Sequence, residues 1–548
     1  MQNKKLYPVT VQELLFYAYF TIMLAIKGFG LTAGPVYQAG FLAASVLAVL
    51  KILLSTYTKK EAGLVFGLLA LAGVSFLQTG DYSVIIYSLL MLSLKGIRQE
   101  RVMKLAATVW TPVFLFQILT QLLNLRTRDF VVHSKYHLGY AVRWALGYTH
   151  PNVLQITYVV TLSYLLYCLH GERLKAEKFL LLMLASAFGA AYFFLYSLSL
   201  TGMIGYLAFA LALLYFEWKR RQNRRITKTE SFLLQCLLPI EIFGAVVLPL
   251  ILQGKAFDLL NRAMTTRPML TREFLTVYGV RLLGSRKPAG ASFTMTLDSS
   301  YAELLFYGGI LIFALMMAGY LYLISRSLKE TPSWRHSVKM AVIFFCLAAA
   351  ISEPFAFNTS FKNVSLIFLG CELLRKKEGE NFCLIGGLSA KTGNYQLHLW
   401  NPCAAAAKLL AVFISGRRTQ GRKAAAAAVL AMAAAAILYG DLAVRQDAYY
   451  CRRRSTDVPD GEMQELYLSK EEIQKLEETP GIRVLNYLDE KDPMFCFTGK
   501  ITEYDYLRGA VSAVLWSGAA AGMLAAGAAG SCAKGTGRRG SVKCVRQL

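Results

Sequence analysis

Long apolar segments alternate with short polar connections along most of the chain. A helix of roughly 20 apolar residues crosses about 30 Å of hydrocarbon. Segments of this kind lie near residues 11–30, 36–55, 62–80, 82–95, 103–124, 152–169, 178–198, 203–217, 232–252, 301–324, 338–351 and 361–374. The pattern predicts an all-α fold, a polytopic integral membrane bundle of about 12 spans.

The basic residues between these segments predict which connections lie inside the cell, because Lys and Arg collect in cytoplasmic loops. With the N-terminus inside, the inner side receives the basic connections near 59–60, 95–104, 173–178, 218–228, 326–339 and 375–377. A composition of 55% hydrophobic and 17% charged residues agrees with this class of protein. The net charge of +25 then needs no nucleic acid, and the sequence carries no nucleic-acid-binding motif. We expect a multi-pass protein of the cell membrane.

The pattern changes after Glu378. We divide the chain into a membrane domain at 1–378, a basic cytoplasmic linker at 379–423, a two-span appendage at 424–530 and a basic tail at 531–548. Within the appendage, 441–508 is polar and is expected outside the cell. SKEEIQKLEE at 469–478 predicts a surface helix there. Cys451 and Cys496 share this outer segment and either pair or stay free.

Two loops predicted to face outside carry more positive charge than the other outer turns. The first loop covers about 125–151 and the second about 253–300. Their basic residues are Arg126, Arg128, Lys135 and Arg143, and Lys255, Arg262, Arg267, Arg272, Arg281, Arg286 and Lys287. Basic side chains beside the membrane suit an anionic partner, of which a diphosphate-bearing lipid is the obvious kind.

The first loop ends in the triplet HPN. Pro151 suits the first turn of the next helix, which leaves His150 and Asn152 at the mouth of the bundle, with Arg143 seven residues earlier. Helix capping and interfacial snorkelling are the alternatives. HSKYH at 133–137 has a spacing that could bind zinc on a helix, but it lacks a further ligand, so we expect no metal.

The second loop contains TTRPMLTREFLTVYG, which predicts a helix that Thr265 or Thr266 caps and Gly279 ends. Arg267 at its N-terminus would make an anion site, with Arg272 as a second candidate. The alternative is an amphipathic interfacial helix without a ligand.

The same loop closes with LDSSYAELLFYGG, in which Asp298 and Glu303 flank Tyr301. Either carboxylate could accept a proton from an attacking hydroxyl, and the alternative is that they cap the next helix. SLSLTG at 197–202 is expected to cap a helix, and Glu353 in ISEPFAFNTS is given no role.

These motifs, in this order, resemble the Wzy-type O-antigen polymerase and O-antigen ligase superfamily over about residues 10–375. The resemblance rests on Arg143 followed by HPN, the turn SLSLTG, and the long outer loop with its Arg-led helix, LLGS at 282–285 and LDSSYAELLFYGG. Leu200 and Asp298 depart from the family's pattern, because many relatives carry Arg and His at these places.

The resemblance implies a GT-C-like, metal-independent glycosyltransferase without a cofactor. It would polymerise undecaprenyl-diphosphate-linked oligosaccharide repeat units, both donor and acceptor, on the outer face of the membrane, with a chain-length regulator as an additional partner. The implied site has Asp298, His150 and Glu303 as catalytic candidates and Arg143, Asn152, Arg267, Arg272 and Tyr301 as substrate-binding candidates. The alternatives are a ligase that uses another acceptor and a flippase of lipid-linked sugars.

Overall fold

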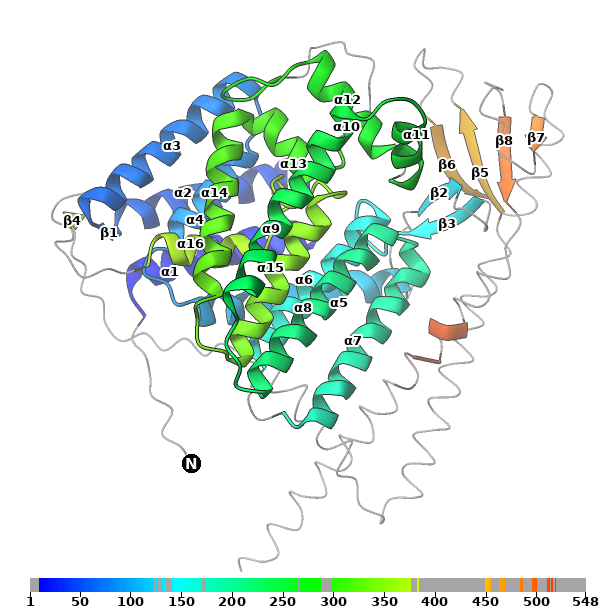
Figure 1. Cartoon of the computed structure of the whole chain (residues 1–548). Coiled ribbons are helices and arrows are strands. Elements are labelled where there is room, and N and C mark those ends of the chain that lie inside the picture. The colour runs from blue at the N-terminus through cyan, green and yellow to red at the C-terminus, as the bar shows by residue number, and fades with distance from the viewer. Residues whose placement is uncertain are drawn as a thin grey trace, which may run out of the picture. The chain divides into compact units, whose positions relative to one another are not determined.

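The computed structural model describes residues 9–122, 125, 130–134, 140–169, 174–264, 266–286, 297–375 and 382–383, together with short pieces at 449–454, 463–468, 483–485, 495–499, 510–512, 514–515 and 518. The chain forms two compact units (Figure 1). Unit 1 comprises Met1–Arg128 and Leu146–Pro402, and unit 2 comprises Asp129–Ala145 and Cys403–Leu548.

Unit 1 is a helical bundle, so the predicted helical membrane fold is confirmed in its broad form. Its first helices are α1 (Val11–Gly28), α2 (Pro35–Leu53), α3 (Lys59–Thr79), α4 (Ser83–Ser93), α5 (Gln99–Leu122), α6 (Pro151–Cys168), α7 (Ala176–Ser197) and α8 (Leu200–Arg221). The later ones are α9 (Lys228–Ile242), η3 (Phe243–Val247), α10 (Leu248–Ile251), α11 (Gly254–Ala263), α12 (Arg267–Val277), α13 (Ser300–Glu303), η4 (Leu304–Gly308), α14 (Gly309–Ser327), α15 (Trp334–Ala350) and α16 (Ser365–Leu373).

Within the described residues, seven helical stretches are long and apolar enough to cross a membrane. They are Pro35–Leu53, Lys59–Thr79, Gln99–Leu122, Ala176–Ser197, Leu200–Arg221, Lys228–Ile251 and Ser300–Ser327. Helices also occupy the five other predicted spans, as α1, α4, α6, α15 and α16. The number of 12 spans therefore stays a prediction, whereas the membrane-spanning character of the bundle is supported by these seven helices.

Capping boxes begin three helices at ends that the charge pattern places inside the cell. In α1, α3 and α9 the N-cap threonines Thr10, Thr58 and Thr227 accept from the backbone of a glutamate three residues later, and that glutamate accepts from the threonine backbone in return. Each box satisfies two backbone N–H groups that a helix end leaves without partners. The three helices therefore start at defined residues.

Helices α8 and α15 run antiparallel and pack closely along their length. Phe209 meets Phe345 edge to face at 6.5 Å, and Phe216 stacks on Phe344 at 6.2 Å between ring centroids. Such apolar ring contacts order a helix pair without polar bonds in the bundle interior. The N-terminus of α8 and the C-terminus of α15 consequently lie at the same end of unit 1.

A break in the helix that follows residue 300 receives the LLGS segment. The π-helix η4 ends at Gly309, whose φ is +79°, and Ile310 and Leu311 then donate to the carbonyls of Arg281 and Leu282 at 3.1 Å. A Cβ at Gly284, whose φ is +103°, would lie 2.1 Å from the carbonyl oxygen of Tyr307. The loop backbone thus completes hydrogen bonds that the irregular helix leaves open, and this contact requires glycine.

Unit 2 contains strands that the sequence analysis did not predict. Strand β2 (Phe130–Ser134) pairs antiparallel with β3 (Tyr140–Trp144). A four-stranded sheet has the order β6 (Met463–Leu468), β5 (Tyr449–Arg454), β8 (Phe495–Gly499) and β7 (Arg483–Leu485). Cys451 and Cys496 lie on the adjacent strands β5 and β8, with Cys451 opposite Thr498 and Cys496 opposite Arg453. The predicted surface helix at 469–478 lies outside the described residues. In unit 1, β1 (Thr56–Tyr57) pairs with β4 (Phe382–Cys383).

Candidate functional site

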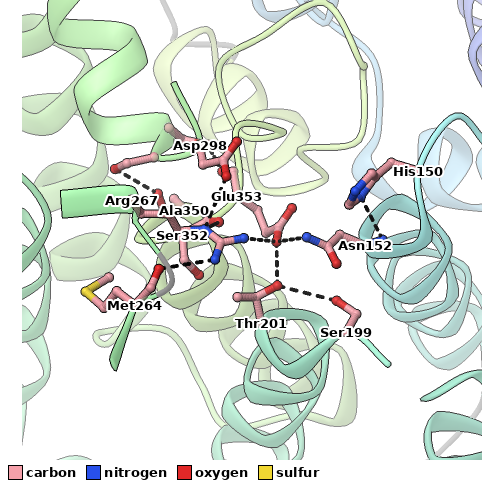
Figure 2. Close-up of polar contacts among 12 residues, drawn as sticks. His150, Asn152, Ser199, Thr201, Met264, Arg267, Asp298, Ala350, Ser352 and Glu353 are labelled. Atoms are coloured by element: carbon pink, nitrogen blue, oxygen red, sulfur yellow. Dashed lines mark hydrogen bonds and ion pairs between the residues drawn. The ribbon is translucent and has the colours of Figure 1, made fainter. Parts of the chain in front are cut away.

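The carboxylate of Glu353 joins side chains from three helices (Figure 2). It follows α15 directly and is 5% exposed. Its Oε1 accepts from Asn152 Nδ2 at 2.8 Å, from the hydroxyl of Thr201, and from Arg267 Nη2 at 3.4 Å. These donors come from the first turns of α6, α8 and α12. We call Asn152, Thr201, Arg267, Asp298 and Glu353 the Glu353 cluster.

Arg267 is held in a fixed orientation within this cluster. Its Nε donates to the carbonyl of Ser352 at 2.8 Å and its Nη1 to the carbonyl of Met264 at 3.3 Å. The Nε also lies 3.5 Å from Asp298 Oδ2. The guanidinium therefore sits between two carboxylates, of which Glu353 is buried and Asp298 has a side chain that is 34% exposed.

The HPN triplet folds as its sequence predicts. His150 is the N-cap of α6 in extended geometry, and its Nδ1 accepts from the backbone of Asn152 at 3.2 Å. Pro151 takes the first helical position, where it has no hydrogen bond to lose. His150 is thus a capping residue, and the cap directs Asn152 toward Glu353 (Figure 2).

The SLSLTG turn both caps a helix and contributes to the cluster. Ser199 accepts from the backbone of Gly202 at 3.2 Å as the N-cap of α8, which confirms the expected capping role. Thr201 faces Glu353. A Cβ at Gly202 would lie 2.4 Å from the side chain of Gln155 on α6. The absence of a side chain at Gly202 therefore lets α8 approach α6 closely enough for Thr201 and Asn152 to share one carboxylate.

The segment around Asp298 is tied to the turn that carries Glu353. Ser299 caps α13, as one of the sequence alternatives had it. Ser300 donates through its hydroxyl to the Glu353 carbonyl and accepts from the backbone of Ala356 at 3.0 Å. Asp298 therefore stays close to Arg267 although about 30 residues separate them in sequence.

The other candidates of the second loop have structural partners. Arg272 donates to the carbonyls of Pro249, at 2.8 Å, and Leu252, which closes the C-terminus of α10. Tyr301 is fully buried, and its hydroxyl donates to Glu241 at 2.9 Å. Glu303 has a buried Oε2 without a hydrogen-bond partner. None of these three has a printed contact with the Glu353 cluster in Figure 2, so their predicted roles stay predictions.

The first loop divides between the two units. Arg143 lies on β3 opposite Val131 and belongs to unit 2, so it is not counted in the cluster. His133 lies on strand β2, so the helical spacing considered for HSKYH is wrong, and His137 lies outside the described residues. No group of three His, Cys, Asp or Glu side chains that could hold a metal occurs among the described residues. Burial raises the pKa of Tyr148, which therefore stays protonated near the cluster's first helix.

Glu353 is the residue that the sequence analysis missed. A glutamate directly after an apolar helix is a costly placement unless it faces a polar site. That placement was the available signal, but its three donors lie 86, 152 and 201 residues away in sequence. Only the packing of α6, α8, α12 and α15 brings them together.

The cluster can bind an anion and accept a proton. The distances of 3.4 and 3.5 Å from Arg267 to its two carboxylates exceed the 2.7–2.9 Å typical of strong charge-assisted bonds, so a phosphate can compete for this guanidinium. Asp298 is the more exposed of the two carboxylates and can accept a proton from a substrate hydroxyl. No family model, curated protein or solved structure matches the chain.

Proposed function

We propose that this protein polymerises undecaprenyl-diphosphate-linked oligosaccharide repeat units on the outer face of the cytoplasmic membrane. The observation that carries the proposal is the convergence of four separate connections on Arg267 and two carboxylates at one end of the bundle. All four connections are the ones that the charge pattern assigns to the outer side. The resemblance to Wzy-type polymerases rests on three of the same segments.

In the proposed reaction, a hydroxyl of one lipid-linked glycan attacks the anomeric carbon of another. The new bond from the acceptor oxygen to that carbon forms as the bond from carbon to the diphosphate oxygen breaks. Asp298 accepts the hydroxyl proton, and undecaprenyl diphosphate leaves with the bonding electrons. Arg267 stabilises the negative charge that develops on this leaving group, which is the type of stabilisation that supplies much of an enzyme's rate enhancement. Glu353 orients Arg267 and Asn152 without touching the substrate.

Two other activities fit a membrane bundle with an outer anion site. A ligase of the same kind would transfer the glycan to a different acceptor, and the cluster serves that reaction equally well. A flippase would move the lipid without making a bond, and such proteins place their charged sites near the middle of the bilayer. The Glu353 cluster lies at helix ends instead, which favours chemistry at the membrane surface.

Reconstituted protein with one synthetic lipid-linked repeat unit separates these activities. A polymerase yields a ladder of products from this single substrate, a ligase yields nothing until a second acceptor is added, and a flippase changes only the leaflet of the lipid. Arg267→Gln should abolish the ladder. Arg262→Gln is the matched control, because Arg262 is an exposed arginine of the same loop on α11. An Arg267→Gln variant with full activity contradicts the proposal.

A further inference from the structure

Two buried lysines lie at the end of unit 1 where α1 stops and where the turn after α15 passes. Lys27 is 4% exposed and Lys362 is 6% exposed. Their ammonium groups are close enough to interact electrostatically. No carboxylate of the described residues forms an ion pair with either lysine. Two like charges buried without a counter-charge are costly, because the protein interior solvates ions poorly.

Lys27 is positioned by a tyrosine. Its Nζ donates to the hydroxyl of Tyr37 at 3.0 Å and lies 4.4 Å from the centroid of the same ring. Lys27 is in the last turn of α1 and Tyr37 in the first turn of α2, so the short connection 29–34 joins them. This arrangement holds the charge in place but does not neutralise it.

Lys362 is positioned by its neighbours and forms no hydrogen bond within the described residues. Phe361 has a φ of +61°, a conformation that is strained for a phenylalanine. Its ring packs on Tyr19 and Phe20 of α1, at 6.4 and 5.8 Å between centroids. Asn363 donates to Tyr320 and to the carbonyl of Ala356. The strained backbone therefore fixes Lys362 between two anchored residues.

Tyr19 supplies an independent indication of a ligand. Its hydroxyl is buried and has no hydrogen-bond partner, although its ring touches Phe361 beside Lys362. A buried hydroxyl without a partner loses hydrogen-bond energy, and such groups in folded proteins call for an explanation. One hydroxyl donor and two ammonium groups are together complementary to a multiply charged oxyanion.

We infer that Lys27 and Lys362, together with Tyr19, bind a diphosphate group separate from the one at Arg267. A phosphate ester carries up to two negative charges and three acceptor oxygens, and lysine is a frequent partner for it. The inference rests on the proposed function in one respect: a polymerase uses two lipid-linked substrates, and we assign this second site to the diphosphate of the other substrate.

Hydrogen bonds connect this lysine site to the Glu353 cluster. Asn363 binds Ala356, whose backbone binds Ser300, which in turn binds the Glu353 carbonyl. On the other side, Gln117 donates to the carbonyls of Phe29, at 3.0 Å, and Gly147, at 2.8 Å. The turn after Lys27 is thus joined to the segment that leads into His150.

Ligand-induced stabilisation of the protein in phosphatidylcholine nanodiscs tests the lysine site. The probes are inorganic pyrophosphate and undecaprenyl diphosphate without sugar. Arg267→Gln should retain part of the rise in melting temperature that these probes cause in the wild type, and Arg267→Gln with Lys362→Met should lose it. Lys362→Met alone should weaken binding at this site by about tenfold or more, which is the loss of one charge-assisted contact. It should also raise the melting temperature of the protein without ligand.

Lys51 provides the matched control. It is also a buried lysine, 1% exposed, but its Nζ donates to Ser55 and to the carbonyl of Lys95, both at 2.6 Å. Lys51→Met should therefore lower the melting temperature of the protein without ligand and leave the ligand-induced rise unchanged. A merely structural Lys362 would behave like Lys51.

The outcomes also separate the two proposals. If Lys362→Met retains the full ligand-induced rise in the Arg267→Gln background, the lysine site is wrong whether or not the glycan ladder forms. If the rise depends on Lys362 but no ladder forms, the anion site stands and the polymerase proposal fails. A larger rise with undecaprenyl diphosphate identifies a lipid headgroup as the ligand. A larger rise with pyrophosphate indicates a free anion and overturns the assignment to a second lipid substrate.

Discussion

Two buried glutamates mark the two ends of helix α8, and arginines surround each in a different way. Near the C-terminus, Glu217 is fully buried and accepts from Arg220 and Arg221, each at 2.7 Å, three and four residues further along the same helix. At the N-terminus, Thr201 contacts Glu353, whose other donors come from α6 and α12. The sixteen residues from 201 to 217 correspond to roughly 24 Å of helix.

The difference separates a local network from a tertiary one. The spacing of Glu217 and its arginines makes them neighbours in any α-helix. This network stabilises the end of α8 where the chain is predicted to enter the cytoplasm. The Glu353 network exists only if several helices pack correctly, so it both depends on the fold and defines a site. Four substitutions test this contrast, in order of decreasing effect.

Glu353→Ala should have the largest effect. It leaves Arg267, whose side chain is 11% exposed, with only the more distant Asp298 as a counter-charge. Removal of one partner from a buried ion pair typically lowers the free energy of unfolding by about 3–5 kcal/mol. We expect that loss in chemical denaturation and no product ladder. Glu353→Gln, which keeps the shape of the side chain, should recover much of the stability but little of the activity.

Asp298→Asn should lower activity more than stability. A positioned general base contributes about 100-fold or more to a rate, whereas the half-exposed Asp298 contributes little to folding. The initial rate of ladder formation in proteoliposomes measures the first effect, and thermal unfolding measures the second. A rate within about threefold of the wild type would remove Asp298 from the catalytic role.

Glu217→Gln should show the reverse behaviour. The side chains of Arg220 and Arg221 are 17% and 28% exposed, so water solvates them when the carboxylate is lost. We expect a decrease of about 1–2 kcal/mol in the free energy of unfolding and an unchanged ladder. If the ladder shortened as strongly as in Glu353→Gln, the two networks would not differ in function.

Asn152→Ala and Thr201→Val should be non-additive, because both residues donate to the same oxygen of Glu353. A double-mutant cycle on the free energy of unfolding should give a coupling of about 1 kcal/mol. Arg220→Ala combined with Thr201→Val is the control pair, since these residues lie at opposite ends of α8. Its coupling should be near zero, and equal values for the two pairs would contradict a shared acceptor.

Much of the fold was predictable because short-range patterns determine it. Apolar run length predicted the positions of helices, and the sequence HPN predicted that Pro151 begins α6. Ser299 and Ser199 cap helices as small hydroxyl residues do at helix starts. These features depend on neighbours within four residues, so the sequence displays them directly.

The candidate site was only partly predictable, for the same physical reason. Arg267, Asp298 and Asn152 were recognisable as polar residues beside predicted spans, but the acceptor Glu353 was not. Arg272 had the same sequence signal as Arg267, yet it closes the C-terminus of α10. The strands of unit 2 were missed because they lie in a polar segment where charge and helix signals dominate. Contacts over 86 to 201 residues leave no periodic trace in the sequence.

The account requires above all that the Glu353 cluster faces the outside of the cell. Arg262 lies in the loop that leads into α12, Arg224 lies between α8 and α9, and both are exposed. Single Arg262→Cys and Arg224→Cys variants in whole cells can be treated with a membrane-impermeant maleimide, against the unsubstituted protein as background. The account predicts that Arg262→Cys is labelled on intact cells and Arg224→Cys only after permeabilisation. Labelling of Arg224→Cys on intact cells, with Arg262→Cys protected, would contradict it.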